Sequence, residues 1–422
     1  MVNRDANDNH SEVVIRLLLG MPVGNTACPE CYQPKFWYSF TAILSQILFV
    51  RTEGGIIFLS ELINFFVGIF TLVFIWKFIK QIASSKGIAL LTFAVIALNS
   101  DLIAINSQGT NDSFVILFGV GATYFLWKYI KTQQFTSAIY MSLLVALAVI
   151  SKGSGLVILA AVVCCLLFYV WVARKQRIYT FYALLLTIGI SLFSIFFFTP
   201  YVYYLQTYGR VDVVNMTKSP PPQFFKETIA KRPGIVSIAS GYLTFQYFDL
   251  LKTPYISNDS HYSVTRTSLW SQLYGRSFSA HFPQWPPTWA DKSEGIILLT
   301  RLIFIFGLLP TIIFILGFVQ SLYEMITGSK TQSFTWIFFI NLGAFVSMLL
   351  IYTYDYRDYS FMKTLFLYPA LLGIIYFLIR GFESINDLFK KYKHVLRVGT
   401  GALLIFLGLE MVDILLLIGH LS

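Results

Sequence analysis

Charged residues are scarce in this sequence, and their scarcity excludes most soluble folds. Asp, Glu, Lys and Arg together make up 12% of the 422 residues, whereas hydrophobic residues make up 56%. A typical soluble domain carries about twice that share of charge. So few polar side chains cannot cover the surface of a folded chain in water. The composition therefore predicts an integral membrane protein and excludes intrinsic disorder, a coiled coil and a disulfide scaffold.

Cysteine is also scarce, since the chain has only four. Cys164 and Cys165 lie in an apolar run, where we expect small buried hydrophobic side chains. Cys28 and Cys31 form a lone C-x-x-C motif. It lacks the second pair typical of a structural zinc site and the βαβ context of a thioredoxin-type site. This pair is either a local disulfide or two ordinary thiols.

Long apolar stretches, separated by charged segments, predict an all-α polytopic membrane protein. A bilayer core about 30 Å thick requires about 20 helical residues to cross. We predict ten spans, at 56–76, 87–105, 113–128, 136–151, 155–173, 178–199, 295–320, 334–353, 361–379 and 398–418. The apolar run 36–50 is different, because its 15 residues rise only about 22 Å as a helix. We expect that helix to lie at the membrane surface.

The net charge of +10 is concentrated in alternate loops between the predicted spans. These loops hold few acids and many cations: Lys77, Lys80, Lys86, Lys128, Lys131, Arg174, Lys175, Arg177, Lys330, Arg380, Lys390, Lys391, Lys393 and Arg397. Cytoplasmic loops of membrane proteins are enriched in Lys and Arg. The positive charge therefore indicates topology, with these loops cytoplasmic, and predicts no nucleic-acid partner.

The remaining polar segments then lie on the extracytoplasmic side. The predicted organisation is an outer loop with a juxtamembrane helix at 1–55, six spans at 56–199, an extracytoplasmic domain at 200–294 and four spans at 295–422. The segment 200–294 is too long for a simple connection. No signal peptide precedes residue 1. Either the N-terminus crosses unaided or an upstream first helix is missing from this chain, and we favour the second.

Polar and charged residues gather at the predicted outer turns. They are Asp5, Asp8, His10, Glu30, Asn111, Asp112, Lys152, Arg357 and Lys363. Each has an ordinary explanation, since Asn or Asp caps a helix and Lys or Arg at a span end reaches the headgroups. Taken together, acids and cations on one face at membrane depth suit an anionic, lipid-borne substrate.

Five sequence blocks, in order, resemble membrane glycosyltransferases of the GT-C superfamily. The first is Asn7-Asp8-Asn9-His10, which is similar to the Asp-Gly-His-x-x-Tyr segment of their first outer loop, and the second is Gln33-Pro34-Lys35-Phe36-Trp37-Tyr38, which is similar to a Gln/His-Pro-Pro-Leu-Tyr-Tyr block. The third is Asn111-Asp112, which is similar to an Asn-Asp before a later span, and the fourth is Ser151-Lys152-Gly153-Ser154-Gly155-Leu156, which is similar to a Leu-Thr-Lys-x-x-Gly-Leu turn. The fifth is the segment Lys363–Ala370, which is similar to a Lys…Tyr-x-x-Pro-Ala block. Dolichyl-phosphate-mannose protein mannosyltransferases and lipid A aminoarabinose transferases look most similar.

The resemblance implies transfer of a sugar from a polyprenyl-phosphate donor to a hydroxyl of a lipid, glycan or protein acceptor. It also implies inversion at the anomeric carbon and an active site on the extracytoplasmic side. The membrane would be a plasma (inner) membrane or the endoplasmic reticulum. Asp8 aligns with the family's acidic position and becomes the expected base, with Asp5 as second choice. Glu30 or Asp112 is expected to orient the acceptor or share a divalent cation.

The same resemblance assigns the other polar residues to substrate binding. Lys152, Arg357 and Lys363 are expected to stabilise the departing phosphate. His10 and Asn111 complete the predicted substrate-binding set, and Asp112 is the candidate metal ligand if a metal is present.

Other interpretations stay open. A transporter or flippase for an amphipathic lipid would also place polar turns at membrane depth, although we find no internal repeat. A non-catalytic remnant of the family is a third interpretation, because its usual first helix is not seen. Glu410 and Asp413, at i, i+3 spacing, are expected to be buried between helices. The segment 270–289 suits either stacking on sugars or a packed lid.

Overall fold

The computed structural model describes residues 10–24, 27–28, 30–172, 176–208, 238–252, 254, 268–279, 293–328, 334–356 and 363–421. Regular secondary structure in these residues is entirely helical. The protein is therefore an all-α polytopic membrane protein, as its composition predicts.

The helices follow the predicted apolar segments closely. In chain order they are α1 (His10–Leu18), α2 (Phe36–Ile47), α3 (Glu53–Ile82), α4 (Lys86–Ala97), α5 (Ser100–Asn106), α6 (Asp112–Thr132), α7 (Phe135–Ser151), α8 (Gly155–Val172), α9 (Arg177–Phe198), α10 (Tyr201–Tyr208), α12 (Ile238–Leu243), α13 (Tyr247–Lys252), α14 (Leu269–Phe278), α15 (Glu294–Thr327), α16 (Thr335–Tyr356), the 3-10 helix η5 (Thr364–Ala370), α17 (Leu371–Leu388) and α18 (Lys393–Leu421).

Among the described residues, eight helices are long and apolar enough to cross a membrane. The pair α4 and α5 brings the number to nine if it is one bent span. The remaining predicted span corresponds to α7, an apolar helix of 17 residues. Each of the ten predicted spans thus coincides with a helix or a helix pair.

The second predicted span is not a single straight helix. The sequence predicts one span at 87–105, whereas α4 and α5 meet at an angle of 56°. Asn99 has an extended backbone between them, and its side chain accepts a hydrogen bond from the amide of Leu102. An Asn in this conformation starts a new helix, so the break follows from local capping that hydropathy does not register.

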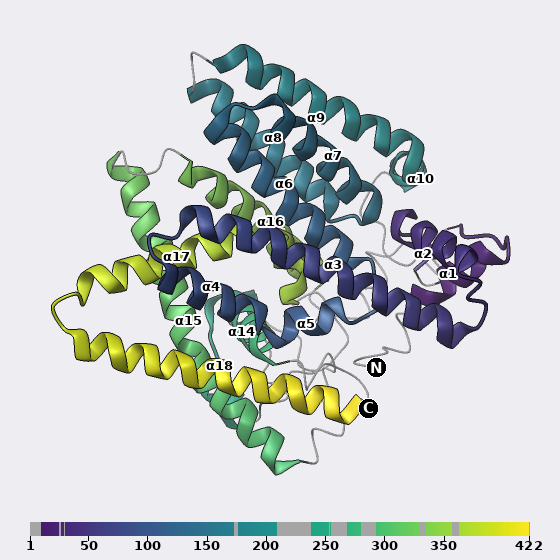
Figure 1. Ribbon diagram of the computed structural model, residues 1–422. Coiled ribbons are helices and arrows are strands. Elements are labelled where there is room, and N and C mark those ends of the chain that lie inside the picture. The colour runs from purple at the N-terminus through teal and green to yellow at the C-terminus, as the bar shows by residue number, and fades with distance from the viewer. Residues whose placement is uncertain are drawn as a thin grey trace.

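The bundle has two packed halves joined through α6 and α17 (Figure 1). Helices α7, α8 and α9 pack against one another on one side, and α15, α17 and α18 form the other. Helix α6 lies between them, and 83% of its most apolar 18-residue stretch is buried. At one end of the bundle, Arg380 on α17 pairs with Glu324 on α15 and with Glu383, at 2.6 Å each.

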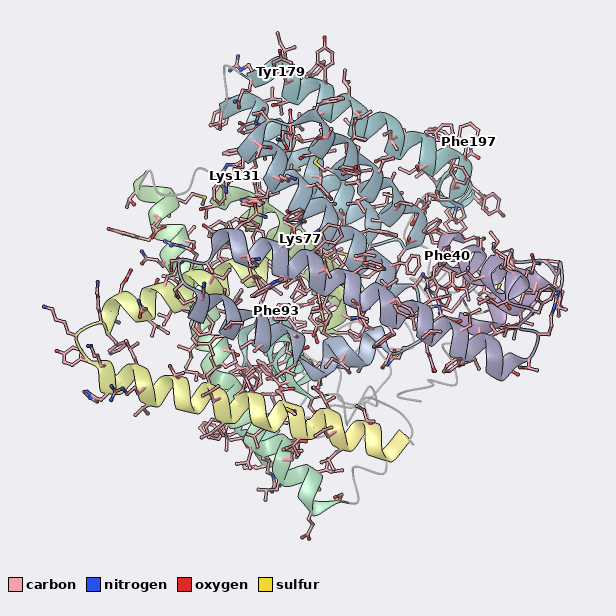
Figure 2. The ribbon with its side chains drawn as sticks, in the orientation of Figure 1. Phe40, Lys77, Phe93, Lys131, Tyr179 and Phe197 are labelled. Atoms are coloured by element: carbon pink, nitrogen blue, oxygen red, sulfur yellow. A yellow bond between two sulfur atoms is a disulfide. The ribbon has the colours of Figure 1, made fainter. Side chains whose placement is uncertain are left out.

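Apolar side chains cover the outside of the bundle as well as its interior. Figure 2 shows Tyr179 and Phe197 projecting from α9 away from the other helices. Both are more than half exposed, as are Phe193, Phe196 and Phe198 on the same helix. Large apolar side chains are costly in water but favourable against lipid tails, so this surface is the one expected to face the bilayer.

The closest helix contact joins α15 to α17 through two glycines. A Cβ atom at Gly317 would lie 1.8 Å from the carbonyl oxygen of Phe377, and one at Gly381 would lie 1.9 Å from that of Ile313. Small residues allow helix backbones to approach in membranes, where the hydrophobic effect does not drive helices together. This contact therefore depends on the absence of a side chain at both positions.

We expect Gly317→Ala to destabilise the protein strongly, because the new methyl group collides with backbone atoms that a rotamer change cannot move. The expected loss is about 3 kcal/mol, the upper end for overpacking. Gly343→Ala on α16 is the matched control, since a methyl group added there would meet nothing within 4 Å. Thermal unfolding in detergent micelles measures both, and equal midpoints would contradict the proposed contact.

Candidate active site

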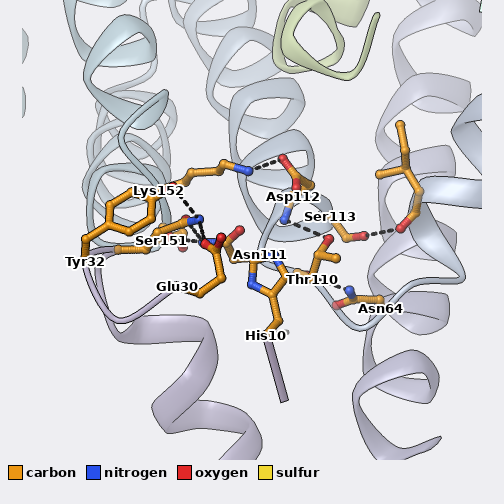
Figure 3. A network of polar contacts seen from close by, with 12 residues as sticks. His10, Glu30, Tyr32, Asn64, Thr110, Asn111, Asp112, Ser113, Ser151 and Lys152 are labelled. Atoms are coloured by element: carbon orange, nitrogen blue, oxygen red, sulfur yellow. Dashed lines mark hydrogen bonds and ion pairs between the residues drawn. The ribbon is translucent and has the colours of Figure 1, made fainter. Parts of the chain in front are cut away.

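Three segments that are distant in the sequence meet in one buried polar cluster (Figure 3). They are the loop before α2, the start of α6 and the turn between α7 and α8. Each contributes a side chain predicted from the sequence: Glu30, the pair Asn111 and Asp112, and Lys152. We define these four residues together with Gln33 and Ser151 as the outer-turn cluster.

A disulfide shapes the loop that carries Glu30. Cys28 and Cys31 are bonded to each other, which decides between the two alternatives left open by the sequence. Both cysteines are buried, and the amide of Cys31 donates to the carbonyl of Cys28 at 3.1 Å. The amide of Gln33 in turn donates to the carbonyl of Glu30 at 3.2 Å. This short closed loop presents Glu30 and Gln33 to α6.

A chain of side-chain hydrogen bonds links this loop to the bundle. Gln33 donates from Nε2 to Glu30 Oε2, and its Oε1 accepts from Asn111 Nδ2. Asn111 Nδ2 also donates to the carbonyl oxygen of Ser151 at 3.1 Å. The two amides thus join the first outer loop, α6 and α7. Because both partners of Asn111 Nδ2 are acceptors, the orientation of its amide is determined.

Asn111 does not serve as an ordinary helix cap. It occupies the N-cap position of α6, but its side chain makes no capping hydrogen bond. The side chain is fully buried, and its Oδ1 has no hydrogen-bond partner among the residues that the structure describes. A buried acceptor left without a partner is costly. Asn111 Oδ1 is thus an unsatisfied buried acceptor within the described part of the outer-turn cluster.

An ion pair lies beside the amide chain. Lys152 Nζ and Asp112 Oδ1 are 2.6 Å apart, and both side chains are largely buried. Lys152 follows the last residue of α7 with an extended backbone, which directs it across to α6 and not along its own helix. Gly155 makes the tight turn possible, since a Cβ there would lie 2.2 Å from the carbonyl oxygen of Ala148. Lys152 thus pairs with Asp112 and does not extend to the headgroups.

Further hydrogen bonds hold the loop before α6 in place. Asn64 on α3 donates to the carbonyl oxygen of Thr110 at 2.6 Å and accepts from Trp37 Nε1 at 3.0 Å. His10 is buried at the start of α1, and its Nδ1 shares a hydrogen bond of 2.7 Å with the Tyr38 hydroxyl. These contacts connect α1, α2 and α3 to the loop before α6. His10 therefore helps to hold α1 against α2 through Tyr38.

Lys35 follows the loop and lies in an unusual electrostatic environment. Its ammonium donates to the carbonyl oxygen of Cys31 and stands 5.8 Å from the centre of the Tyr38 ring. Burial lowers the pKa of Lys35 to about 8, while the nearby Glu30 carboxylate opposes that shift. Lys35 therefore exchanges its proton close to neutral pH.

The structure describes only some of the other predicted site residues. Asp5, Asp8 and Arg357 lie outside the described residues. Lys363 is not part of the outer-turn cluster, because it precedes η5 and interacts electrostatically with Asp101. Gln33, Asn64 and Ser151 were not among the predicted site residues. Gln33 carried a signal, since it opens the Gln-Pro block of the resemblance, whereas Asn64 lies in an apolar span and gave none.

A divalent cation does not fit the described part of the cluster. In that part of the chain, no group of three or more His, Cys, Asp or Glu residues is arranged to hold a metal ion. Asp112 is paired with Lys152, and Glu30 accepts from Gln33. A lone carboxylate already paired with an ammonium is a poor Mg²⁺ or Ca²⁺ site, so we assign no step to a metal.

Neither a family model nor a curated protein sequence matches this chain. Among solved structures, it is similar to the oligosaccharyltransferase of Archaeoglobus fulgidus, solved in complex with zinc and sulfate, with 12% identity and a TM-score of 0.49. The match covers 96% of this chain and 49% of that one, so this chain spans about half its length. A likeness at this level carries no argument about function, which must rest on the residues themselves.

Removal of the Gln33 amide should loosen the whole cluster. We expect Gln33→Leu to lower stability by about 2–4 kcal/mol, because it removes the two buried hydrogen bonds that Gln33 makes with Glu30 and Asn111. Gln46→Leu on the exposed face of α2 is the matched control. Thermal unfolding midpoints in micelles report the difference, and hydrogen exchange of residues 107–112 tests whether the effect reaches α6. An effect no larger than that of Gln46→Leu would count against the amide chain.

The lowered pKa of Lys35 predicts a specific pH dependence of stability. Between pH 8 and the ordinary lysine value of 10.5, the unfolded chain binds the proton more tightly than the folded one. The contribution of Lys35 to stability should therefore rise with pH in this window and stay constant below it. The midpoint difference between wild type and Lys35→Met measures this contribution. A difference that does not change with pH would show that Lys35 is not desolvated.

Proposed function

We propose that this protein is a membrane glycosyltransferase that moves a sugar from a polyprenyl-phosphate donor to an acceptor hydroxyl on the extracytoplasmic side. The observation that carries the proposal is the convergence of Glu30, Asn111, Asp112 and Lys152 in one buried cluster. Asn111, Asp112 and Lys152 come from two of the sequence blocks that resemble the GT-C superfamily, and Glu30 lies just before a third, which begins at Gln33. The acceptor is a lipid, a glycan or a protein.

The chemistry requires a base on one side of the sugar and a cation on the other. A carboxylate takes the proton of the acceptor hydroxyl as its oxygen forms a bond to the anomeric carbon. The bond from that carbon to the phosphate oxygen breaks, and polyprenyl phosphate leaves with the electron pair. Attack opposite to the leaving group inverts the configuration. Asp8 is the proposed base, with Asp5 or Glu30 as substitutes.

Lys152 suits the leaving-group side. Its ammonium is largely buried and held by one carboxylate, Asp112, so its charge is fixed in position before substrate arrives. A preorganised cation stabilises charge that develops in the transition state more effectively than a mobile one does. Arg357 is proposed to assist at the same phosphate, whereas Lys363 interacts with Asp101 outside the outer-turn cluster. The unpartnered Asn111 Oδ1 is proposed to bind the acceptor or a sugar hydroxyl.

One observation favours transport as a second candidate function. Discontinuous helices at membrane depth are typical of transporter binding sites, and α4 and α5 form such a bent pair. A lipid transporter, however, has no use for a carboxylate placed to activate a hydroxyl. Transfer activity therefore separates the two functions.

The test is a transfer assay in nanodiscs with a panel of labelled polyprenyl-phosphate sugars. We expect wild type to transfer label with at least one donor. Asp8→Asn should reduce kcat by about 100-fold or more, as is usual for loss of a general base. Lys152→Met should produce a comparable loss through the leaving group. Glu53→Gln, at an exposed position at the start of α3, is the control and should retain full activity.

Each outcome of this assay has a distinct meaning. If Asp8→Asn retains activity, the proposed reaction stands and the base is Asp5 or Glu30. If Lys152→Met retains activity, Lys152 does not stabilise the leaving phosphate. A folded wild-type protein that transfers no sugar from any donor contradicts the proposal, and lipid translocation between leaflets then becomes the activity to measure.

A further inference from the structure

A second buried polar centre lies beyond α5, separate from the outer-turn cluster. Four elements contribute to it: the break between α4 and α5, α14, η5 and α18. We name it the α5 centre, and its members are Asn99, Asp101, Arg276, Tyr368 and Glu410. None of them was assigned a role by the sequence resemblance.

Directed hydrogen bonds organise the α5 centre. The Tyr368 hydroxyl lies 2.8 Å from Asp101 Oδ2 and 3.1 Å from Asn99 Oδ1. The hydroxyl has one proton and can donate it to only one of these two acceptors at a time. It donates to the Asp101 carboxylate, because a hydrogen bond to a carboxylate is stronger than one to an amide oxygen. Asn99 donates to the carbonyl of Ser277, which attaches α14 to the helix break.

Charge is present on several sides of the α5 centre. Arg276, on α14, is only 8% exposed, and its Nε donates to Gln272 Oε1 at 3.1 Å. It interacts electrostatically with Asp101, as does Lys363 from the segment before η5. A charged group at membrane depth is costly, and such groups are functional candidates by default.

Glu410 contributes an acceptor atom that the protein leaves unused. The residue is 1% exposed on α18, and its Oε2 accepts from the amide of Ser100 at 3.3 Å. Its Oε1 has no hydrogen-bond partner in the described part of the chain. Asp101 nearby is less deeply buried than Glu410 by its surface exposure. A buried acceptor without a described partner, beside a partly exposed acid, can receive hydrogen bonds from a ligand.

The α5 centre lies in the outer half of the predicted span. With a rise of about 1.5 Å per residue, Glu410 lies about 18 Å along α18 from residue 398, where the predicted span begins. The bilayer core is about 30 Å thick. If the basic loops are cytoplasmic, a headgroup bound in the outer leaflet is therefore within reach of the α5 centre.

The charges indicate which ligand suits the α5 centre. The α5 centre combines acceptors and cations, since Asp101 interacts electrostatically with Arg276 and Lys363 and also lies near Glu410. A hydroxyl-rich group fits this mixture, because each hydroxyl donates to a carboxylate and accepts from an Arg or Lys at once.

We infer that the α5 centre binds the glycosyl group of a substrate, whereas the outer-turn cluster handles the phosphate and the reacting hydroxyl. The inference rests on the proposed function for the source of the sugar. That source is either the sugar of the lipid-linked donor or a glycan acceptor. Asp101 and Glu410 accept hydrogen bonds from its hydroxyls, and Arg276 donates to them.

Binding measurements in nanodiscs test the inference without relying on catalysis. The probes are polyprenyl-phosphate hexoses, polyprenyl phosphate without a sugar, and free methyl hexosides and oligosaccharides. We expect wild type to bind at least one sugar-bearing probe. Glu410→Gln and Asp101→Asn should each weaken that binding about tenfold, the usual effect of losing a hydrogen bond to a charged group. Binding of polyprenyl phosphate without a sugar should not change.

Two further variants serve as an alternative test and as a control. Tyr368→Phe removes the hydroxyl but keeps the ring, so it tests the α5 centre if a carboxylate variant does not fold. Glu53→Gln is the control for loss of a carboxylate elsewhere on the outer side. Hydrogen exchange of residues 99–106 and 269–278 should slow when a sugar-bearing probe binds, which locates the ligand.

The outcomes separate this inference from the proposed function. Weaker binding of the lipid-linked hexose alone assigns the α5 centre to the donor, and weaker binding of the free glycan assigns it to the acceptor. Sugar-bearing probes that bind all variants equally, or do not bind wild type at all, overturn the inference. Sugar binding that depends on Asp101 and Glu410 without any transfer supports the α5 centre and contradicts the glycosyltransferase function.

Discussion

The hydrogen bond between the amides of Gln33 and Asn111 is the interaction on which the outer side of the molecule depends. It joins a loop closed by a disulfide to the central helix α6, and Asn111 extends the link to the end of α7. In a region with little water, an amide without a partner is costly, so the loop has one favourable position. Glu30, Asp112 and Lys152 are close together because of it.

The bilayer explains why polar groups are concentrated in two places. Helices satisfy their own backbone hydrogen bonds in lipid, and polar side chains among them are tolerated only where they pair. The outer-turn cluster and the α5 centre both contain charged groups, and each has a buried acceptor that no described residue pairs with, Asn111 Oδ1 or Glu410 Oε1. The five-residue loop between α5 and α6 separates the two centres. Their separation suits a substrate with a charged part and a neutral part.

Sequence reasoning predicted the helices and four residues that the structure brings together in the outer-turn cluster. Apolar length located each span, because a bilayer imposes one length on every helix that crosses it. It did not find the break at Asn99, since capping is a local effect that leaves hydropathy unchanged. It placed Glu30, Asn111, Asp112 and Lys152 in one site by resemblance. It assigned no role to Asn64 or Asp101, because a single polar residue within or beside an apolar segment has no pattern that reveals its partner.

The amino-acid sequence by itself determined the class of protein, the number of helices within narrow limits and the side on which the basic loops are expected. These follow from composition and from local periodicity, which depend on residues close together in the chain. Only the tertiary structure decided which polar side chains pair, that Asn111 is not used as a cap, and that Arg276 and Glu410 approach Asp101. Such contacts join residues from 40 to 310 positions apart, and helix packing, not local preference, brings them together.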